Sequence, residues 1–340
     1  MTIRPLVSVI IPLHEGAAFI EDTLTSLAEQ TVDDLEVIVV DDGSTDAGPE
    51  LVVEHPVGAK LIRQDRTGVA IARNRGSYHA SGTWLAFLDQ DDLWHRSRVE
   101  GLVATLRASS QGFVFTNTTS FAATEDRETI MRAGPYVEKM IDIWVNRGEE
   151  LTALCRGPVP SVTKPLAEKL YRLEDVMSGT LVTTTSFLVR SDHMRLVGGW
   201  SPHARSIDDW WLMASAAYVE PILGIDQPTH LYRIHAGATS RSTKFWYAYS
   251  SSLVAMRFGD NYVSRPAALR TPLNNDVAEH LFDQMLRSGE LAGDSPAAHY
   301  ARHMASVLWP ERRIGRDMLK ASLRRRLPRL SRAWSAHRDR

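Results

Sequence analysis

Residues 84–92, Trp84-Leu85-Ala86-Phe87-Leu88-Asp89-Gln90-Asp91-Asp92, place three carboxylates directly after a short apolar run. The apolar part is typical of a buried strand, and acids so close together repel one another unless a positive group holds them. Hard divalent cations prefer carboxylate oxygens as ligands. The stretch therefore predicts a strand that ends at a metal site, with a metal-bound phosphate as a further expectation.

Strand and helix patterns alternate through the first 120 residues around this stretch. The strands are nearly continuous apolar runs, and the helices repeat apolar residues every three or four positions. This alternation predicts an α/β fold with a mostly parallel sheet, helices on both faces and ligands at the carboxyl ends of the strands. The expected strands are residues 7–11, which Pro12 ends, 35–40, 61–62, 84–88, 113–115 and 183–189, and the expected helices are 18–29 and 68–80.

The composition is that of an ordinary globular protein, with 44% apolar and 24% charged residues among 340. A single cysteine, Cys155, excludes an internal disulfide framework and indicates a reducing compartment. The first residues lack the apolar core of a secretory signal, and no apolar run approaches the ~20 residues of a membrane span. We therefore expect a cytoplasmic protein.

The charge is unevenly distributed along the chain. Residues 301–340 hold 12 Lys and Arg against 3 Asp and Glu, a net charge of +9, so the other 300 residues carry −11 of the total of −2. Residues 311–340 also place apolar side chains on one helical stripe, although Pro328 must kink or split this helix. Two interpretations remain open. Either the stripe packs on the rest of the protein, or the basic segment contacts the inner face of the cell membrane peripherally. Nucleic acid is not expected as a partner, because no recognised module accompanies the charge.

Three other segments carry groups suited to chemistry. Asp41-Asp42-Gly43-Ser44-Thr45-Asp46 fits a tight turn with helix-capping residues, but two acids directly after Val40 also suit contacts to a base or ribose. Asp208-Asp209-Trp210-Trp211 fits the acidic start of a helix or a general base whose pKa is raised by its surroundings. Residues 230–240 combine His, Arg and hydroxyl groups that suit a diphosphate.

The metal expected at Asp89-Gln90-Asp91-Asp92 is Mg²⁺ or Mn²⁺. The spacing and terminal Glu of a calcium-binding EF-hand loop are absent. Magnesium and manganese sites commonly use one or two carboxylates together with substrate phosphates. The alternative interpretation is a solvated loop with a helix cap.

The order of the motifs narrows the interpretation further. Along the chain stand Pro12, 41–46 (DDGSTD), 68–76 (GVAIARNRG), 87–94 (FLDQDDLW), 197–200 (VGGW), 208–212 (DDWWL) and 232–235 (YRIH). In this order, they resemble the family 2 (GT2) inverting glycosyltransferases of GT-A fold over roughly residues 6–240. The resemblance implies a GT-A Rossmann-like mixed sheet, with a nucleotide-sugar-binding half in residues 1–110 and an acceptor-binding half in 111–245. Residues 246–340 would form a helical C-terminal extension with the basic tail.

The resemblance also implies a reaction and its residues. A sugar would pass from a nucleotide diphosphate donor, UDP-linked in most of the family, to an acceptor hydroxyl with inversion. Asp209 would be the catalytic base and Asp91 the metal ligand. The remaining positions implied are Pro12, Asp42, Arg73, Asn74 and Asp89 at the nucleotide, Arg233 and His235 at the diphosphate, and Asp208 and Trp210 at the acceptor. Surface polysaccharide, glycolipid and natural-product acceptors all remain open.

The sequence departs from the family pattern at two places. His14 and Glu15 stand where the family often has Tyr-Asn, and Asp208 replaces a Glu before the base. Two other functions remain as alternatives. A nucleotidyltransferase would need a Gly-rich, basic loop after the first strand, where residues 12–16 read PLHEG. A non-catalytic nucleotide-sugar-binding protein would not need both Asp91 and Asp209.

Overall fold

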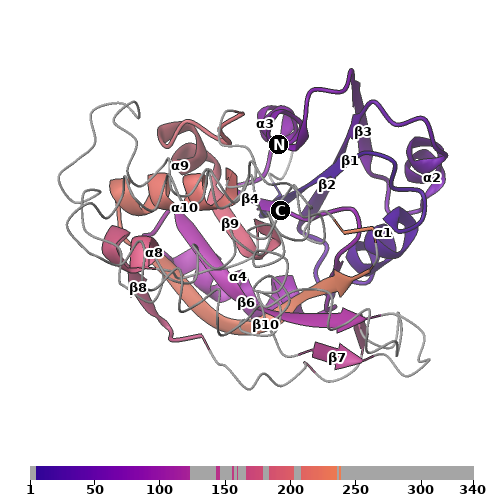
Figure 1. The fold of residues 1–340 in the computed structure, drawn as a ribbon. Helices are drawn as coiled ribbons and strands as arrows, with labels where there is room; N and C mark the ends of the chain where they lie inside the picture. The colour runs from indigo at the N-terminus through magenta and orange to yellow at the C-terminus, as the bar shows by residue number, and fades with distance from the viewer. Residues whose placement is uncertain are drawn as a thin grey trace, which may run out of the picture. The chain divides into compact units, whose positions relative to one another are not determined.

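The computed structural model describes residues 5–122, 143–145, 155–156, 159, 166–178, 184–202, 208–235 and 237–238 (Figure 1). All of these belong to the first of two compact units, which comprises residues 1–242 and 264–273. The predicted helical extension of residues 246–340 and its basic tail lie outside the described residues.

The first half of this unit alternates strands and helices, which confirms the α/β prediction. Its central strand β1 pairs in parallel with β2 on one side and with β4 on the other, and β3 extends the sheet beyond β2. The elements are β1 (Val7–Leu13), α1 (Ile20–Ala28), β2 (Leu35–Asp42), α2 (Gly48–Glu54), β3 (Lys60–Gln64), α3 (Val69–His79) and β4 (Trp84–Phe87).

The second half continues the same sheet but mixes strand directions. The strand order is β3-β2-β1-β4-β9-β6-β10-β5, and in the described part β7 pairs with β6 and β8 with β10. Strand β9 is antiparallel to both of its neighbours, whereas β6 and β10 are parallel. The elements are β5 (Leu93–Trp94), α4 (Arg98–Ala108), β6 (Phe113–Ala122), β7 (Ile143–Val145), β8 (Lys169–Tyr171), α8 (Leu173–Ser178), the 3₁₀ turn η1 (Thr184–Ser186), β9 (Phe187–Arg190), α9 (Ser191–Leu196), α10 (Asp208–Val219) and β10 (Ile222–Ile234).

Helices cover both faces of the sheet, as Figure 1 shows for the first half. Alternate residues of β1, such as Val9 and Ile11, join one buried cluster with apolar side chains of α1 and α4. The opposite face of β2 packs on Ala72 of α3. Helix α3 lies so close to β1 that a Cβ on Gly76 would stand 2.4 Å from the side chain of Ile10. A larger residue at this position would push the helix away from the strand end that it serves.

Several strand boundaries differ from the sequence prediction, and the largest difference is in β6, which runs to Ala122 instead of ending at residue 115. Strand β1 runs through Pro12 to Leu13 instead of ending at Pro12. Because β4 pairs with β1 only as far as Ile10, Pro12 lies beyond the last residue pair on that side, where the missing N–H is tolerated. Strand β9 begins at Phe187, after the 3₁₀ turn, and not at residue 183.

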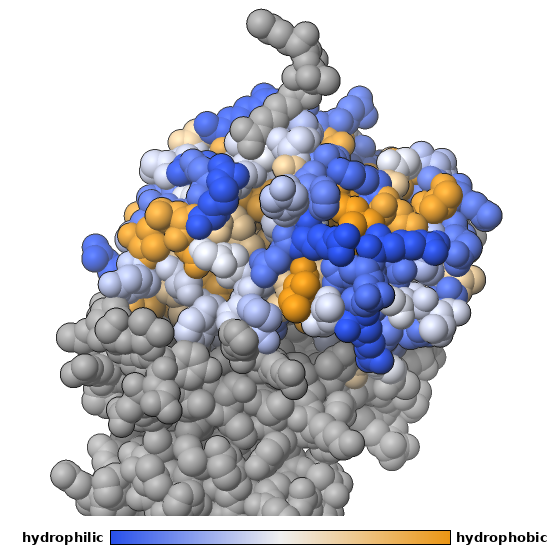
Figure 2. All heavy atoms as spheres, turned by 90° about the horizontal axis from the view of Figure 1, so that it is seen from above, coloured by the Kyte–Doolittle hydropathy of each residue, from blue (hydrophilic) through white to orange (hydrophobic). Residues whose placement is uncertain are grey.

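The described surface mixes polar and apolar side chains. Figure 2 shows separate apolar groups among hydrophilic residues on the face in view. Tyr78 and Val53 are the most exposed large apolar residues, at 85% and 67%. Within the described residues, no helix has the length and apolar character needed to cross a membrane.

Candidate active site

Asp42 ends β2 and is enclosed by the loop that leads into α3. Its Oδ1 accepts hydrogen bonds from the backbone N–H of Thr67 at 2.7 Å and the amide of Gln64 at 2.8 Å. The Thr67 hydroxyl donates to the same oxygen, and the N–H of Gly68 donates to Oδ2 at 2.8 Å. Burial alone raises the pKa of Asp42, but these hydrogen bonds outweigh it and hold the pKa below its ordinary value. The carboxylate therefore stays charged. Its Oδ1 accepts three of these hydrogen bonds and its Oδ2 accepts one.

Arg73 connects the acidic strand end to the start of α10. Its guanidinium donates to Asp89 at 2.7 Å and to Asp208 at 2.8 Å, and its side chain is only 6% exposed. The guanidinium also lies over the ring of Trp200, 4.7 Å from the centroid. Burial lowers the pKa of Arg73, but the two carboxylates outweigh this effect, so its pKa is raised and the cation persists. Arg73 thus occupies the position of an internal counter-ion.

Asn74, the next residue of α3, has its amide engaged with the protein. Its nitrogen donates to the carbonyl of Trp200 at 2.7 Å, and its oxygen accepts from the N–H of Trp200 at 2.8 Å. These bonds hold the turn in which Gly198 and Gly199 adopt φ values of +85° and +73°. In this structure, Asn74 holds the backbone of Trp200, whose ring lies against the guanidinium of Arg73. The contact of Asn74 with the nucleotide stays a prediction.

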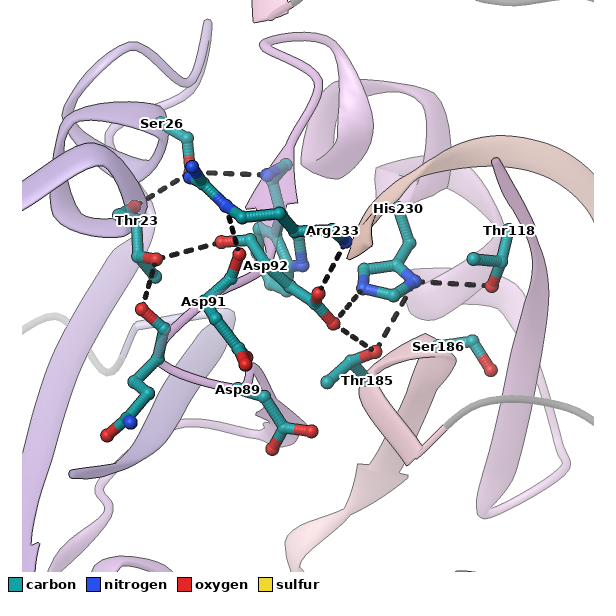
Figure 3. Close-up of polar contacts among 12 residues, drawn as sticks. Thr23, Ser26, Asp89, Asp91, Asp92, Thr118, Thr185, Ser186, His230 and Arg233 are labelled. Carbon is teal, nitrogen blue, oxygen red and sulfur yellow. Dashed lines mark hydrogen bonds and ion pairs between the residues drawn. The ribbon is translucent and has the colours of Figure 1, made fainter. Parts of the chain in front are cut away.

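The three acids after β4 have different surroundings (Figure 3). Asp89 is 34% exposed and is held by Arg73. Asp91 is 27% exposed, and its Oδ2 lies 3.0 Å from Nε2 of His235. Asp92 is 1% exposed, and its Oδ2 lies 3.0 Å from Nε2 of His230. Burial, followed by the charge of Asp91, raises the pKa of Asp92 well above its ordinary value.

Arg233 approaches this cluster from β10, but its contacts are with the protein. Its Nε donates to the backbone carbonyl of Asp91 at 2.6 Å, and a terminal nitrogen donates to Asp22 at 3.0 Å. The side chain is 4% exposed and lies over the rings of Phe19 and Phe121, 5.1 and 5.2 Å from their centroids. This burial leaves little of the guanidinium for the diphosphate contact that the sequence predicts.

Asp209 stands in the first turn of α10, next to the Arg73–Asp208 ion pair. Burial, followed by the neighbouring charge of Asp208, raises the pKa of Asp209 to about 7. The Thr184 hydroxyl donates to its Oδ2 at 3.3 Å. A carboxylate with such a pKa can accept a proton near neutral pH. Trp210, predicted at the acceptor, is 3% exposed, whereas Trp211 is more accessible.

The residues around Asp91 suit a divalent cation that is completed by substrate. Asp91 offers a partly exposed carboxylate, and the imidazole of His235 faces it. In the described part of the chain, no group of three or more His, Cys, Asp or Glu forms a closed metal site. Mg²⁺ and Mn²⁺ bind through few protein ligands when phosphate oxygens and water complete the coordination. The fit is therefore to an ion that binds together with a diphosphate.

The structure gathers most of the predicted residues at one edge of the sheet. Arg233 and His235 both contact Asp91, and Arg73 joins the nearby Asp89 to Asp208. Pro12 and Asp42 lie at the ends of the neighbouring strands β1 and β2. Sequence reasoning missed Asp22 and Thr184, and it grouped His230 with residues suited to a diphosphate, whereas the structure places it against Asp92. Their partners lie 25 to 211 positions away along the chain, so local patterns carry no signal of them.

Comparison with known proteins gives related sequences for this region. Residues 8–157 match the family described as glycosyl transferase family 2. The putative teichuronic acid biosynthesis glycosyltransferase TuaG of Bacillus subtilis is 35% identical over 117 residues, which are 33% of this chain and 46% of TuaG. The glycosyltransferase GlyA of Streptococcus pneumoniae is 24% identical over 313 residues, 88% of this chain and 40% of GlyA. The chain thus spans less than half of each relative.

Solved structures show the same fold. The mannosyltransferase PcManGT of Pyrobaculum calidifontis, in complex with GDP-Man and Mn²⁺, superposes with a TM-score of 0.54 at 20% identity, covering 98% of this chain and 84% of the other. S. aureus TarS 1-349 in complex with UDP-GlcNAc gives 0.52 at 15% identity, covering 83% and 73%. The mixed sheet with flanking helices is therefore a GT-A fold, and residues 8–157 within it match the model of glycosyl transferase family 2.

Proposed function

We propose that this protein is an inverting glycosyltransferase that moves a sugar from a UDP-linked donor to an acceptor hydroxyl. The observation that carries the proposal is the double ion pair of Arg73 with Asp89 and Asp208. It holds the acidic end of β4, suited to the donor, beside the start of α10, where Asp209 has a pKa of about 7. This arrangement supports a single site in which the groups proposed for the leaving diphosphate and for the attacking hydroxyl lie together.

Asp209 is the proposed general base. An acceptor hydroxyl becomes a competent nucleophile when a carboxylate takes its proton as it attacks the anomeric carbon. The pKa of about 7 matches this task, since the carboxylate is substantially ionised near neutral pH yet basic enough to accept the proton. Attack from the face opposite the diphosphate breaks the anomeric C–O bond in a single displacement and inverts the configuration. The electron pair of that bond leaves with the diphosphate.

Asp91 is the proposed protein ligand of Mg²⁺ or Mn²⁺, and His235 lies beside it. When bound, the ion would act as a Lewis acid toward the negative charge that builds on the diphosphate. His235 is placed to add electrostatic stabilisation from the end of β10. Arg233 supports this side by holding the backbone carbonyl of Asp91. The presence of Mn²⁺ in the PcManGT complex supports this assignment.

The surroundings of Asp42 favour uracil as the donor base. Each carboxylate oxygen has about two lone pairs, and Oδ1 already faces three donors from Gln64 and Thr67. Oδ2 accepts only from Gly68 among the described contacts. A guanine presents two adjacent N–H groups that need both oxygens, whereas the single N3–H of uracil needs one. Asp42 therefore suits the UDP type of donor better than the GDP type.

The acceptor and the location of the protein are also proposals. The name of TuaG refers to teichuronic acid biosynthesis, which supports a surface polysaccharide acceptor over glycolipid or natural-product acceptors. A nucleotide-sugar donor and a single cysteine support a cytoplasmic location.

A panel of nucleotide sugars tests the central proposal. The full chain is incubated with each UDP- and GDP-sugar, with and without Mn²⁺, and release of the nucleoside diphosphate is followed. We expect Mn²⁺-dependent release from one or more UDP-sugars. Binding of a UDP-sugar without release or transfer to any glycan acceptor would favour a non-catalytic binding protein. Release of pyrophosphate from a nucleoside triphosphate would favour a nucleotidyltransferase.

A further inference from the structure

Asp92 is buried beneath the loop that carries Asp91, and it contacts two other segments of the chain (Figure 3). Its Oδ2 lies 3.0 Å from Nε2 of His230 and 3.2 Å from the hydroxyl of Thr185. Its Oδ1 accepts a hydrogen bond of 2.9 Å from the backbone N–H of Arg233. These contacts join the loop to β10 and to η1. The carboxyl group therefore serves the protein and is not exposed to a ligand.

His230 is held at both ends of its imidazole ring. The side chain is fully buried, and Nδ1 lies 3.2 Å from the Thr118 hydroxyl of β6 and 3.3 Å from that of Thr185. His230 also pairs with Trp94 in the antiparallel β5–β10 ladder, just after a register shift between β10 and β6. Contacts at both nitrogens fix the orientation of the ring, so Nε2 points at Asp92.

The loop that carries Asp91 is also held on the side that faces α1. The Thr23 hydroxyl of α1 lies 2.8 Å from the carbonyl of Gln90 and 2.9 Å from that of Asp92. The Nε of Arg233 holds the intervening carbonyl of Asp91 at 2.6 Å. The backbone on both sides of Asp91 therefore has fixed partners, and only the Asp91 side chain faces the site.

We propose that Asp92 and His230 are positioning residues that set Asp91 for metal binding. Their contact fixes the end of β10 against the Asp91–Asp92 backbone. His235 lies five residues beyond His230, so the same contact sets the distance of 3.0 Å between His235 and Asp91. The inference rests on the proposed function, in which Asp91 holds the divalent ion. Groups that orient a metal ligand typically change metal affinity by about 10- to 100-fold when they are lost.

Two amide substitutions of His230 test whether its contact with Asp92 positions Asp91, or whether any buried polar side chain suffices at this place. A Gln side chain places its amide nitrogen near the position of Nε2, within reach of Asp92, whereas an Asn side chain reaches only the position of Nδ1. In the full chain with UDP present, Mn²⁺ affinity is measured from the electron paramagnetic resonance signal of free Mn²⁺. We expect His230→Asn to weaken Mn²⁺ binding about tenfold and His230→Gln to bind nearly as wild type.

A pair of isosteric variants on β6 provides the control and covers the case that His230→Asn does not fold. Thr118→Val removes the hydroxyl that contacts His230, while Thr116→Val removes one that contacts the buried Arg98 instead. We expect Thr118→Val to weaken Mn²⁺ binding and Thr116→Val to leave it unchanged, even if both lower the melting temperature. Equal Mn²⁺ affinity in all folded variants would overturn the positioning role. A wild-type chain that binds UDP but no Mn²⁺ would instead overturn the proposed metal-assisted function.

Discussion

The guanidinium of Arg73 donates a hydrogen bond of 2.8 Å to Asp208, which lies 135 positions further along the chain. The same guanidinium donates to Asp89. One buried cation therefore compensates a carboxylate from the loop after β4 and one from the start of α10. In the proposed function, this arrangement couples the donor side to the acceptor side through a group that belongs to the protein.

Replacing Arg73 with Met should destabilise the protein strongly. Breaking a buried ion pair typically costs 3–5 kcal/mol, and we expect about 3 kcal/mol here because Asp89 is partly exposed. Chemical denaturation measures the change. The matched control is Arg63→Met, which removes an ion pair with Glu50 in which both side chains are 60% exposed. This substitution should lower the free energy of unfolding by less than about 1 kcal/mol. A similar loss of unfolding free energy in the two variants would argue against a structural role for the ion pairs of Arg73 with Asp89 and Asp208.

Replacing Asp209 with Asn should abolish sugar transfer while UDP binding persists. The amide keeps the shape of the side chain but cannot accept the proton of the acceptor hydroxyl. Turnover is measured as UDP release with acceptor, and binding by calorimetry. Asp192→Asn is the control, because Asp192 also stands in the first turn of a helix but is 62% exposed. Retention of most activity in Asp209→Asn would exclude this residue as the base.

The stability of the protein should respond to pH through Asp209. Its pKa is about 7 in the folded protein and about 3.9 in an unfolded chain, so the folded state binds the proton more tightly. The stabilising contribution is full below pH about 4 and is lost as pH rises through about 7. We expect the melting temperature of Asp209→Asn, relative to that of wild type, to rise between pH 5 and pH 8. Equal differences at both pH values would show that the Asp209 carboxyl is not perturbed.

The preference for UDP over GDP should depend on the hydrogen bonds that the Asp42 carboxylate already accepts from the protein. In the presence of Mn²⁺, UDP should raise the melting temperature, whereas GDP should have little effect. Gln64→Leu removes one donor from Oδ1 and should narrow the difference between the two nucleotides. Thr45→Val, in the same strand-end region but bonded to Glu15, is the control. A larger shift with GDP than with UDP in wild type would contradict the assignment of uracil.

Vesicle binding distinguishes the two interpretations of residues 311–340, which are packing on the rest of the protein and contact with a membrane. If this segment contacts a membrane, replacing Arg324, Arg325 and Arg326 with Glu in the full chain should abolish pelleting with anionic vesicles. Vesicles that contain only zwitterionic lipids provide the comparison. Pelleting of wild type that is equal to that of the triple variant would leave the packed apolar stripe as the better interpretation.

Local patterns in the sequence were sufficient for the elements of the first half. Continuous apolar strands and helical repeats depend on neighbouring residues, so residues 35–40 and 68–80 were recognisable as the strand β2 and the helix α3. The positions of the acids at strand ends followed from the rule that parallel strands present their carboxyl ends at one edge. The irregular second half was predicted less well, because its strand pairings join segments far apart in the chain.

The sequence by itself determined the resemblance to family 2 glycosyltransferases, the α/β fold and the residue types available to the site. Only the tertiary structure decided how those residues are used. The three adjacent acids look equivalent in sequence, yet Asp89 pairs with Arg73, Asp91 faces His235 and Asp92 is buried against His230. The physical reason is that burial and charge compensation depend on partners brought together by folding. Neighbouring carboxylates therefore acquire different partners and different tasks.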